Sequence, residues 1–155
     1  MDIFQKIERE HQDFRQWSEE IAETKDRDVE TREDLFKKLY CKLTAHHKAE
    51  EDILNPVLRE NKETREFATE IDEEHNVIDF LMEQLRDLPA DAENWLTKFN
   101  IMKGQLDHHL EDEEEDIAPK AREVFQTDRL ANLTEQFEKN RSDRQKNLEN
   151  TYSKA

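Results

Sequence analysis

Residues that interrupt helices are scarce in this chain of 155 residues. It contains one glycine and three prolines, and because sheets and tight turns need such residues, their scarcity favours an all-α fold. A single cysteine, Cys41, excludes an internal disulfide and fits a reducing compartment. No apolar run could span a bilayer, and residues 1–10 are too charged for a signal peptide, so we expect a cytoplasmic protein without a membrane partner.

Positive charge is also in short supply. The 24 lysines and arginines are outnumbered by 40 acidic residues, for a net charge of −16. Nucleic-acid phosphate and anionic membranes would repel such a chain, whereas cations would be attracted, so we expect no nucleic-acid partner. Hydrophobic residues make up 34% and charged residues 41%, a balance that suits amphipathic helices with charged outer faces.

Apolar residues recur at spacings of three and four in four segments, which is the pattern of amphipathic helices. The predicted helices cover residues 2–23, 31–61, 62–88 and 91–118. Beyond Pro119, apolar residues as far as Phe137 predict a short extra helix packed on the others, and the polar stretch 138–155 predicts an exposed helix or a disordered tail. We therefore expect a helical domain at 1–125, followed by a C-terminal helix and polar tail at 126–155.

An internal repeat relates the two halves of the chain. A histidine followed four residues later by a glutamate occurs twice, 63 residues apart, and another histidine precedes each pair by 34 or 35 residues. These six residues, all on apolar stripes, are His11, His46, Glu50, His75, His109 and Glu113. Residues four apart share one face of a helix. Two such helical hairpins, packed antiparallel, predict a four-helix bundle with a site between facing helices.

The chemistry of this site follows from the cost of burying charge. A buried carboxylate without a partner costs several kcal/mol, and two would repel each other, so a pair of cations would remove the problem. Two imidazoles for each metal and two bridging carboxylates give each ion four protein ligands. An oxo, hydroxo or water bridge adds a fifth and leaves one position open to a small molecule. Such ligands without thiolate suit iron or manganese, and zinc as well.

The order His, His-x-x-x-Glu, His, His-x-x-x-Glu, with its acidic run and following proline, resembles the haemerythrin-like (HHE) cation-binding family over roughly residues 1–125. The resemblance implies an antiparallel four-helix bundle around a non-haem di-iron centre (Fe2+/Fe3+), with an oxo or hydroxo bridge. It implies four terminal histidine ligands and two bridging glutamates. These are His11, His46, His75 and His109 for the terminal positions, and Glu50 and Glu113 for the bridges.

Two departures from the oxygen carriers bear on function. Oxygen-carrying haemerythrins have five histidines, with His-x-x-x-His on the third helix and His-x-x-x-x-Asp on the fourth. Here Asp79 stands four residues after His75, and Glu113 stands four after His109. The chain is therefore more similar to relatives with four histidines and two glutamates, which include di-iron proteins of iron–sulfur repair and the iron-sensing domain of an F-box protein.

The remaining histidines and acids need an interpretation as well. The repeat selects His46 over its neighbour His47, because Leu110 occupies the place equivalent to His47. We interpret His47 and His108 as residues of the helix flank, outside the ligand set; the alternatives for either are a group that supports a ligand or a pH-sensitive surface residue. Candidates to accept the second N–H of a ligand imidazole are Glu10, Glu51, Glu74, Asp79 and Asp107. With 40 acidic residues in the chain, solvated surface is the favoured interpretation for each of these five.

The function expected from this sequence is that of a non-haem di-iron protein that binds, senses or reacts with oxygen, nitric oxide or peroxide. Enzymatic removal of peroxide or nitric oxide fits the same site. The alternatives are an iron-sensing module, read by a protein partner that the sequence does not identify, and an iron-storing or iron-delivering protein. A ferritin-like oxidase is disfavoured, because its Glu-x-x-His order is the reverse of the one here.

Overall fold

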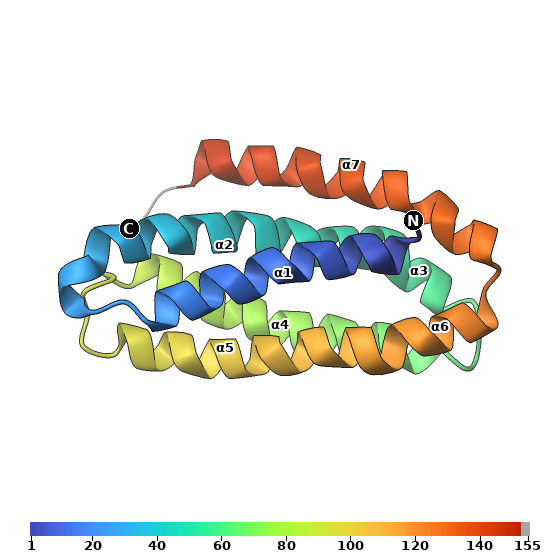
Figure 1. Ribbon diagram of the computed structural model, residues 1–155, viewed down its shortest axis with the longest axis horizontal. Coiled ribbons are helices and arrows are strands. Elements are labelled where there is room, and N and C mark those ends of the chain that lie inside the picture. Colours follow the sequence, from blue (N-terminus) through green and yellow to red (C-terminus); the bar gives the residue numbers. More distant parts are fainter. Residues whose placement is uncertain (153–155) are drawn as a thin grey trace.

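The computed structural model describes residues 1–152, which are helical almost throughout and contain no strand. Four long helices form an antiparallel bundle, so the predicted fold class is confirmed. They are α1 (Ile3–Ala22), α2 (Val29–Ala49), α4 (Arg65–Asp87) and α5 (Trp95–Asp112). A further helix, α7 (Thr127–Thr151), packs along α2 and α1 on the outside of the bundle (Figure 1). No helix within the described residues is long and apolar enough to cross a membrane.

The ends of the helices are set by local chemistry. A capping box begins α1: the Asp2 carboxylate accepts the Gln5 N–H, and the Gln5 side chain accepts the Asp2 N–H, both at 2.9 Å. A 3-10 turn, η1 (Asp26–Asp28), joins α1 to α2. Next to it the buried Arg32 donates to the carbonyl of Ala90 at 2.7 Å. This bond ties the start of α2 to the loop between α4 and α5.

Both helices that carry a His-x-x-x-Glu pair widen into a π-helix that begins at the glutamate. The segments that follow α2 and α5 are η2 (Glu50–Leu54) with α3 (Asn55–Leu58), and η3 (Glu113–Ile117) with α6 (Ala118–Val124). Pro56 and Pro119 each stand six residues after the glutamate. A proline has no N–H, and its ring crowds the carbonyl four residues earlier, so α-helical spacing is interrupted there. The fourth helix therefore continues beyond its predicted end, as far as Val124.

The core consists of two apolar clusters at opposite ends of the bundle. One contains Phe14, Phe36, Trp95 and Phe99. The other contains Phe4, Ile7, Leu58 and Phe137. On α1, His11 lies between a residue of the second cluster, Ile7, and one of the first, Phe14. The same order holds on the other three bundle helices, so a layer of polar side chains divides the core near its middle.

Helix α7 is longer than the short helix predicted after Pro119. Its apolar side is buried at Leu130, Leu133 and Phe137. The helix continues through the stretch that was predicted to be an exposed helix or a disordered tail, and at its end the ring of Tyr152 lies 5.6 Å from that of Tyr40. Residues 153–155 of the predicted tail lie outside the described residues.

Candidate metal centre

All six predicted site residues converge in the polar layer of the bundle, and a seventh residue joins them. Among residues 1–152, nitrogen and oxygen atoms that could hold a metal, each within 4.8 Å of the others, form three buried groups. These groups are His11, His46, Glu50 and Glu113; Glu50, His75, His109 and Glu113; and His47, His75 and His109. The first two groups share both glutamates, and the last two share two histidines.

Each imidazole in the layer is oriented by a carboxylate at its Nδ1 atom. The pairs are His11 with Glu114 (2.7 Å), His46 with Glu10 (2.8 Å), His47 with Asp79 (2.7 Å), His75 with Glu51 (2.8 Å) and His109 with Glu74 (2.7 Å). An ionised carboxylate can only accept a hydrogen bond, so each Nδ1 carries the proton. In the neutral imidazole each Nε2 then carries the lone pair that could bind a metal, as is usual for histidine ligands.

Many of the atoms that face the centre have no hydrogen-bond partner among the described residues. They are Nε2 of His11, His46 and His47, Oε2 of Glu50, and both carboxylate oxygens of Glu113. Buried polar atoms in proteins are nearly always paired, so a cluster of unpaired electron-pair donors requires an explanation. Metal cations would accept these lone pairs and neutralise the two carboxylates. The residues present therefore fit a metal centre.

Electrostatics without a metal point to the same conclusion. Burial, together with the charge of Glu113, raises the pKa of Glu50 well above its ordinary value. Burial alone would lower the pKa of His46 and that of His109, but the nearby carboxylates, Glu50 and Glu113 among them, outweigh it and raise the two values to about 10 and about 9. Protons thus balance the buried negative charge when no cation is present. A cation would displace those protons.

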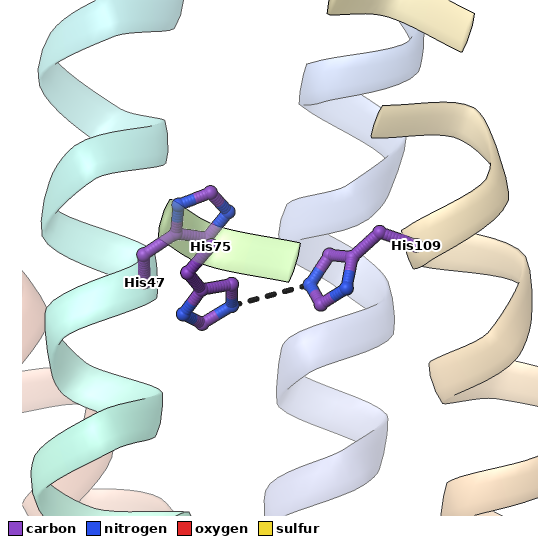
Figure 2. A group of neighbouring side chains, drawn as sticks. All are labelled: His47, His75 and His109. Carbon is purple, nitrogen blue, oxygen red and sulfur yellow. Dashed lines mark hydrogen bonds between the residues drawn. The ribbon is translucent and has the colours of Figure 1, made fainter. Parts of the chain in front are cut away.

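The predicted placement of His47 on the helix flank is wrong. Its side chain is fully buried, and its ring stacks on that of His75 with the centroids 3.8 Å apart (Figure 2). Figure 2 also shows His75 facing His109, with 3.2 Å between their Nε2 atoms. His108 does lie on the flank as predicted: its side chain is 68% exposed, and it pairs with Asp112 at 3.1 Å.

The repeat placed His47 wrongly because the two halves of the chain hold different residues both at this position and at the position that it contacts. In the first hairpin α2 carries His47, which bonds Asp79 of α4. Leu110 on α5 takes the place of His47, since each directly follows the histidine of a His-x-x-x-Glu pair. Arg15 on α1 takes the place of Asp79, since they stand four residues after His11 and His75. Histidine and aspartate thus change together into leucine and arginine. This joint difference is visible in the sequence, but only the structure shows that the two residues meet.

Four of the five candidate carboxylates do hold an imidazole of the buried layer, so the favoured interpretation of these four as solvated surface was wrong. The exception is Asp107, which pairs with Lys103 at 2.8 Å. Sequence reasoning missed Glu114, which holds His11. The repeat could have revealed it, because Glu114 stands 63 residues after Glu51, which holds His75. Each of these two glutamates thus orients a histidine of the other hairpin.

Comparisons with known proteins bear on the same residues. Residues 2–121 match the family model of the Hemerythrin HHE cation binding domain. The match includes every residue of the buried layer and ends within α6, so it leaves out α7. The comparisons with curated proteins and with solved structures found no significant match.

Proposed function

This chain belongs to the Hemerythrin HHE cation binding family, and from that premise we propose that it is a cytoplasmic, non-haem di-iron protein that binds, senses or reacts with oxygen, nitric oxide or peroxide. The observation that carries the proposal is the pair of buried four-residue groups that share Glu50 and Glu113. Two carboxylates common to both groups can bridge two ions. The absence of thiolate and the mixture of imidazole with carboxylate favour iron.

The two proposed metal positions differ in their terminal ligands. The first position has His11 and His46. The second has His75 and His109, and we propose His47 as its third terminal ligand, because it forms a buried group with these two histidines and its Nδ1 atom is bonded to Asp79. Together with the two shared carboxylates and one oxygen from solvent, the residues present would offer five ligands to a metal at the first position and six at the second. A small ligand would therefore bind at the first position.

The surroundings of the first position suit a small ligand of low polarity. Leu110, fully buried, occupies the place equivalent to His47, so an apolar side chain stands where the second position has an imidazole. The edge of the Phe14 ring packs against His46, with the centroids 5.0 Å apart. The ligating residues themselves are at most 2% exposed. A ligand must therefore be small to reach the centre without opening the bundle.

The chemistry of the centre would be shared between the metal and the chain. Iron supplies Lewis-acid and redox chemistry when bound. The chain keeps each imidazole oriented through its Nδ1 hydrogen bond, supplies two bridging carboxylates and excludes water from the layer. Removal of peroxide or nitric oxide fits this arrangement, as does reversible binding.

An iron-sensing role is the second candidate, and one observation favours it. Without metal, Glu50 and Glu113 face each other in a buried layer, and the pKa of Glu50 rises well above its ordinary value. Metal binding would relieve that repulsion, so metal occupancy would be coupled to folding. A protein partner could then read the folded state.

Reconstitution of the full chain with Fe2+ under anaerobic conditions tests the proposal. We expect two irons per chain by metal analysis, and a change in the optical spectrum on addition of oxygen, nitric oxide or peroxide. The sensor would instead lose helicity when iron is removed, and its spectrum would not respond to these ligands. A chain that stays folded and binds no iron would contradict both candidates.

A further inference from the structure

Helix α7 lies outside the segment that matches the family, yet it reaches the metal centre. It packs along α2 and α1, the helices that carry His46 and His11 (Figure 1). The fully buried Phe137 of α7 packs against the imidazole of His46 in a T-shaped arrangement, with the centroids 5.4 Å apart and the planes at 85°. A side chain of α7 is thus in contact with one of the proposed metal ligands.

A second contact runs from α7 to the same imidazole through a buried carboxylate. The Nε of Arg141 donates to Oε2 of Glu10 at 2.9 Å, and Oε1 of Glu10 accepts the Nδ1–H of His46 at 2.8 Å. Glu10 is 2% exposed, and the Arg141 side chain is 13% exposed. Lys6 also approaches Glu10, but only to 3.8 Å. Arg141 is therefore the main cation that holds Glu10 in place.

The other imidazoles are anchored without α7. Among residues 1–152, the carboxylates that hold His11, His47, His75 and His109 make no hydrogen bond or ion pair to that helix. Glu114, for example, is held by Arg15 of α1, with bonds of 2.8 and 3.0 Å. His46 alone depends on α7, through both Phe137 and Arg141.

We propose that α7 retains the metal at the first position, with Arg141 as a positioning residue that acts through Glu10 on His46. This inference rests on the two-metal centre proposed above. Release of the metal at the first position requires the His46 imidazole to turn away from the centre. Docked α7 opposes that motion, because Phe137 fills the space beside the ring and Arg141 fixes the carboxylate that orients it.

The way in which α7 is attached suits it to such a role. The half of the helix that ends at Phe137 is held by buried apolar side chains. Beyond Phe137 the apolar side chains Leu148 and Tyr152 are only partly buried, and the other contacts are polar, such as the exposed ion pair between Arg144 and Asp52. Exposed ion pairs are weak and are screened by salt. The second half of α7, which contains Arg141, can therefore separate from the bundle more easily than the first half.

Metal release from the full chain loaded with Co2+ tests the proposal. Co2+ is the probe because its visible absorption reports the geometry at each ion, and excess EDTA captures what is released. The variant is Arg141→Met. The matched control is Arg144→Met, one turn further along α7, whose arginine pairs with the surface residue Asp52. Circular dichroism and urea unfolding of both variants establish that the bundle is retained.

We expect Arg141→Met to speed the release of one of the two Co2+ ions about tenfold, at the lower end of the effect of removing the direct partner of a ligand, because Arg141 acts through Glu10. Release of the other ion should stay within about twofold of wild type, and Arg144→Met should change neither rate. The absorption of the faster ion should shift in Arg141→Met, and Arg141→Lys should restore both the rate and the spectrum in part.

Two results would overturn the inference while leaving the two-metal centre intact. One is release from Arg141→Met that equals release from Arg144→Met for both ions. The other is equal acceleration of both ions, which would show a general loosening of the bundle. Failure of the wild-type chain to bind two Co2+ ions would overturn the proposed centre itself, together with the inference that rests on it.

Discussion

The two proposed metal positions are related by the repeat, but the residues behind their histidines differ. At the first position, arginines neutralise both supporting carboxylates: Arg15 pairs with Glu114 at 2.8 Å and Arg141 with Glu10 at 2.9 Å. At the second position, Glu74 and Asp79 form no ion pair with a lysine or arginine within residues 1–152. Its third supporting carboxylate, Glu51, has Lys48 at 3.3 Å.

This difference bears on how strongly each position holds a metal. A carboxylate that accepts the Nδ1–H of an imidazole makes its Nε2 a better donor. The second position has three imidazoles that are supported in this way, whereas the first has two. We therefore expect the second position to bind its metal more tightly, through three well-supported imidazoles. The first position, with two imidazoles and one open place, is suited to bind exchangeable ligands.

Loss of a ligand that both positions share should weaken metal binding at both of them. Glu113→Gln takes away a carboxylate that belongs to both four-residue groups. We expect metal affinity to fall at least about 100-fold at each position, so that the purified chain retains almost no iron by metal analysis. Glu115→Gln, at an exposed position of the same π-helix, is the control. Retention of one full equivalent of iron would show that Glu113 serves a single ion.

Replacing the histidine that distinguishes the positions should make them alike. His47→Leu copies the residue found at the equivalent place, Leu110. We expect affinity at one position to fall about 10- to 100-fold, with the other unchanged, as measured by titration with Co2+. His108→Leu, at an exposed position, should leave both affinities unchanged. Unaltered binding of two ions by His47→Leu would limit His47 to a packing role.

The metal-free and metal-loaded chains should respond to pH in opposite directions. In the metal-free chain the pKa values of His46 and His109 are raised to about 10 and about 9. The stabilisation linked to these two groups is complete below their ordinary value of 6.5 and is lost as the pH rises through 9 to 10. Ligation requires neutral imidazoles, so the metal-loaded chain should instead release metal below about pH 6.

Melting temperatures of the two forms between pH 5 and pH 10 check this expectation. The melting temperature of the metal-free form should fall from pH 7 to pH 10, and that of the loaded form from pH 7 to pH 5. Parallel profiles would contradict the view that protons and metal compete for the same buried groups. Full retention of iron well below pH 6 would contradict imidazole ligation.

The smallest expected effect comes from a variant that should make the metal-free chain more stable while it weakens metal binding. Glu50→Gln removes one of two carboxylates that repel each other in the metal-free layer. We expect the free energy of unfolding of the metal-free chain to rise by about 1 kcal/mol, measured with urea, while metal affinity falls. The gain should grow above pH 4.5, because the raised pKa of Glu50 makes folding less favourable as its proton is lost. Destabilisation of the metal-free variant would contradict this account of the layer.

Much of the candidate metal centre could be predicted from the sequence. The spacing of apolar residues placed four helices, and the 63-residue repeat identified six of the seven residues in the buried layer. Neighbouring positions were harder to resolve, because His46 and His47 differ by only about 100° around a helix. The repeat alone placed His47 outside the layer. It could not reveal that Asp79, on a different helix, would hold that imidazole inside.

Helix α7 shows a second limit of prediction from the sequence. Its apolar residues predicted a helix that packs on the bundle, but no pattern along the chain indicates where such a helix docks. Docking over His46 depends on the shape of the groove along α1 and α2, and on an arginine meeting a glutamate that lies 131 residues away in the sequence.

Helical periodicity is a local property, because it depends on residues less than two turns apart, and the repeat of ligand types is found by comparing one half of the sequence with the other. They were enough to define an all-helical bundle with imidazoles and carboxylates in its interior. Which carboxylate supports which imidazole, and how the two metal positions differ, depends on contacts between separate helices. Those contacts exist only once the helices have packed, since packing sets the distances that hydrogen bonds and ion pairs require.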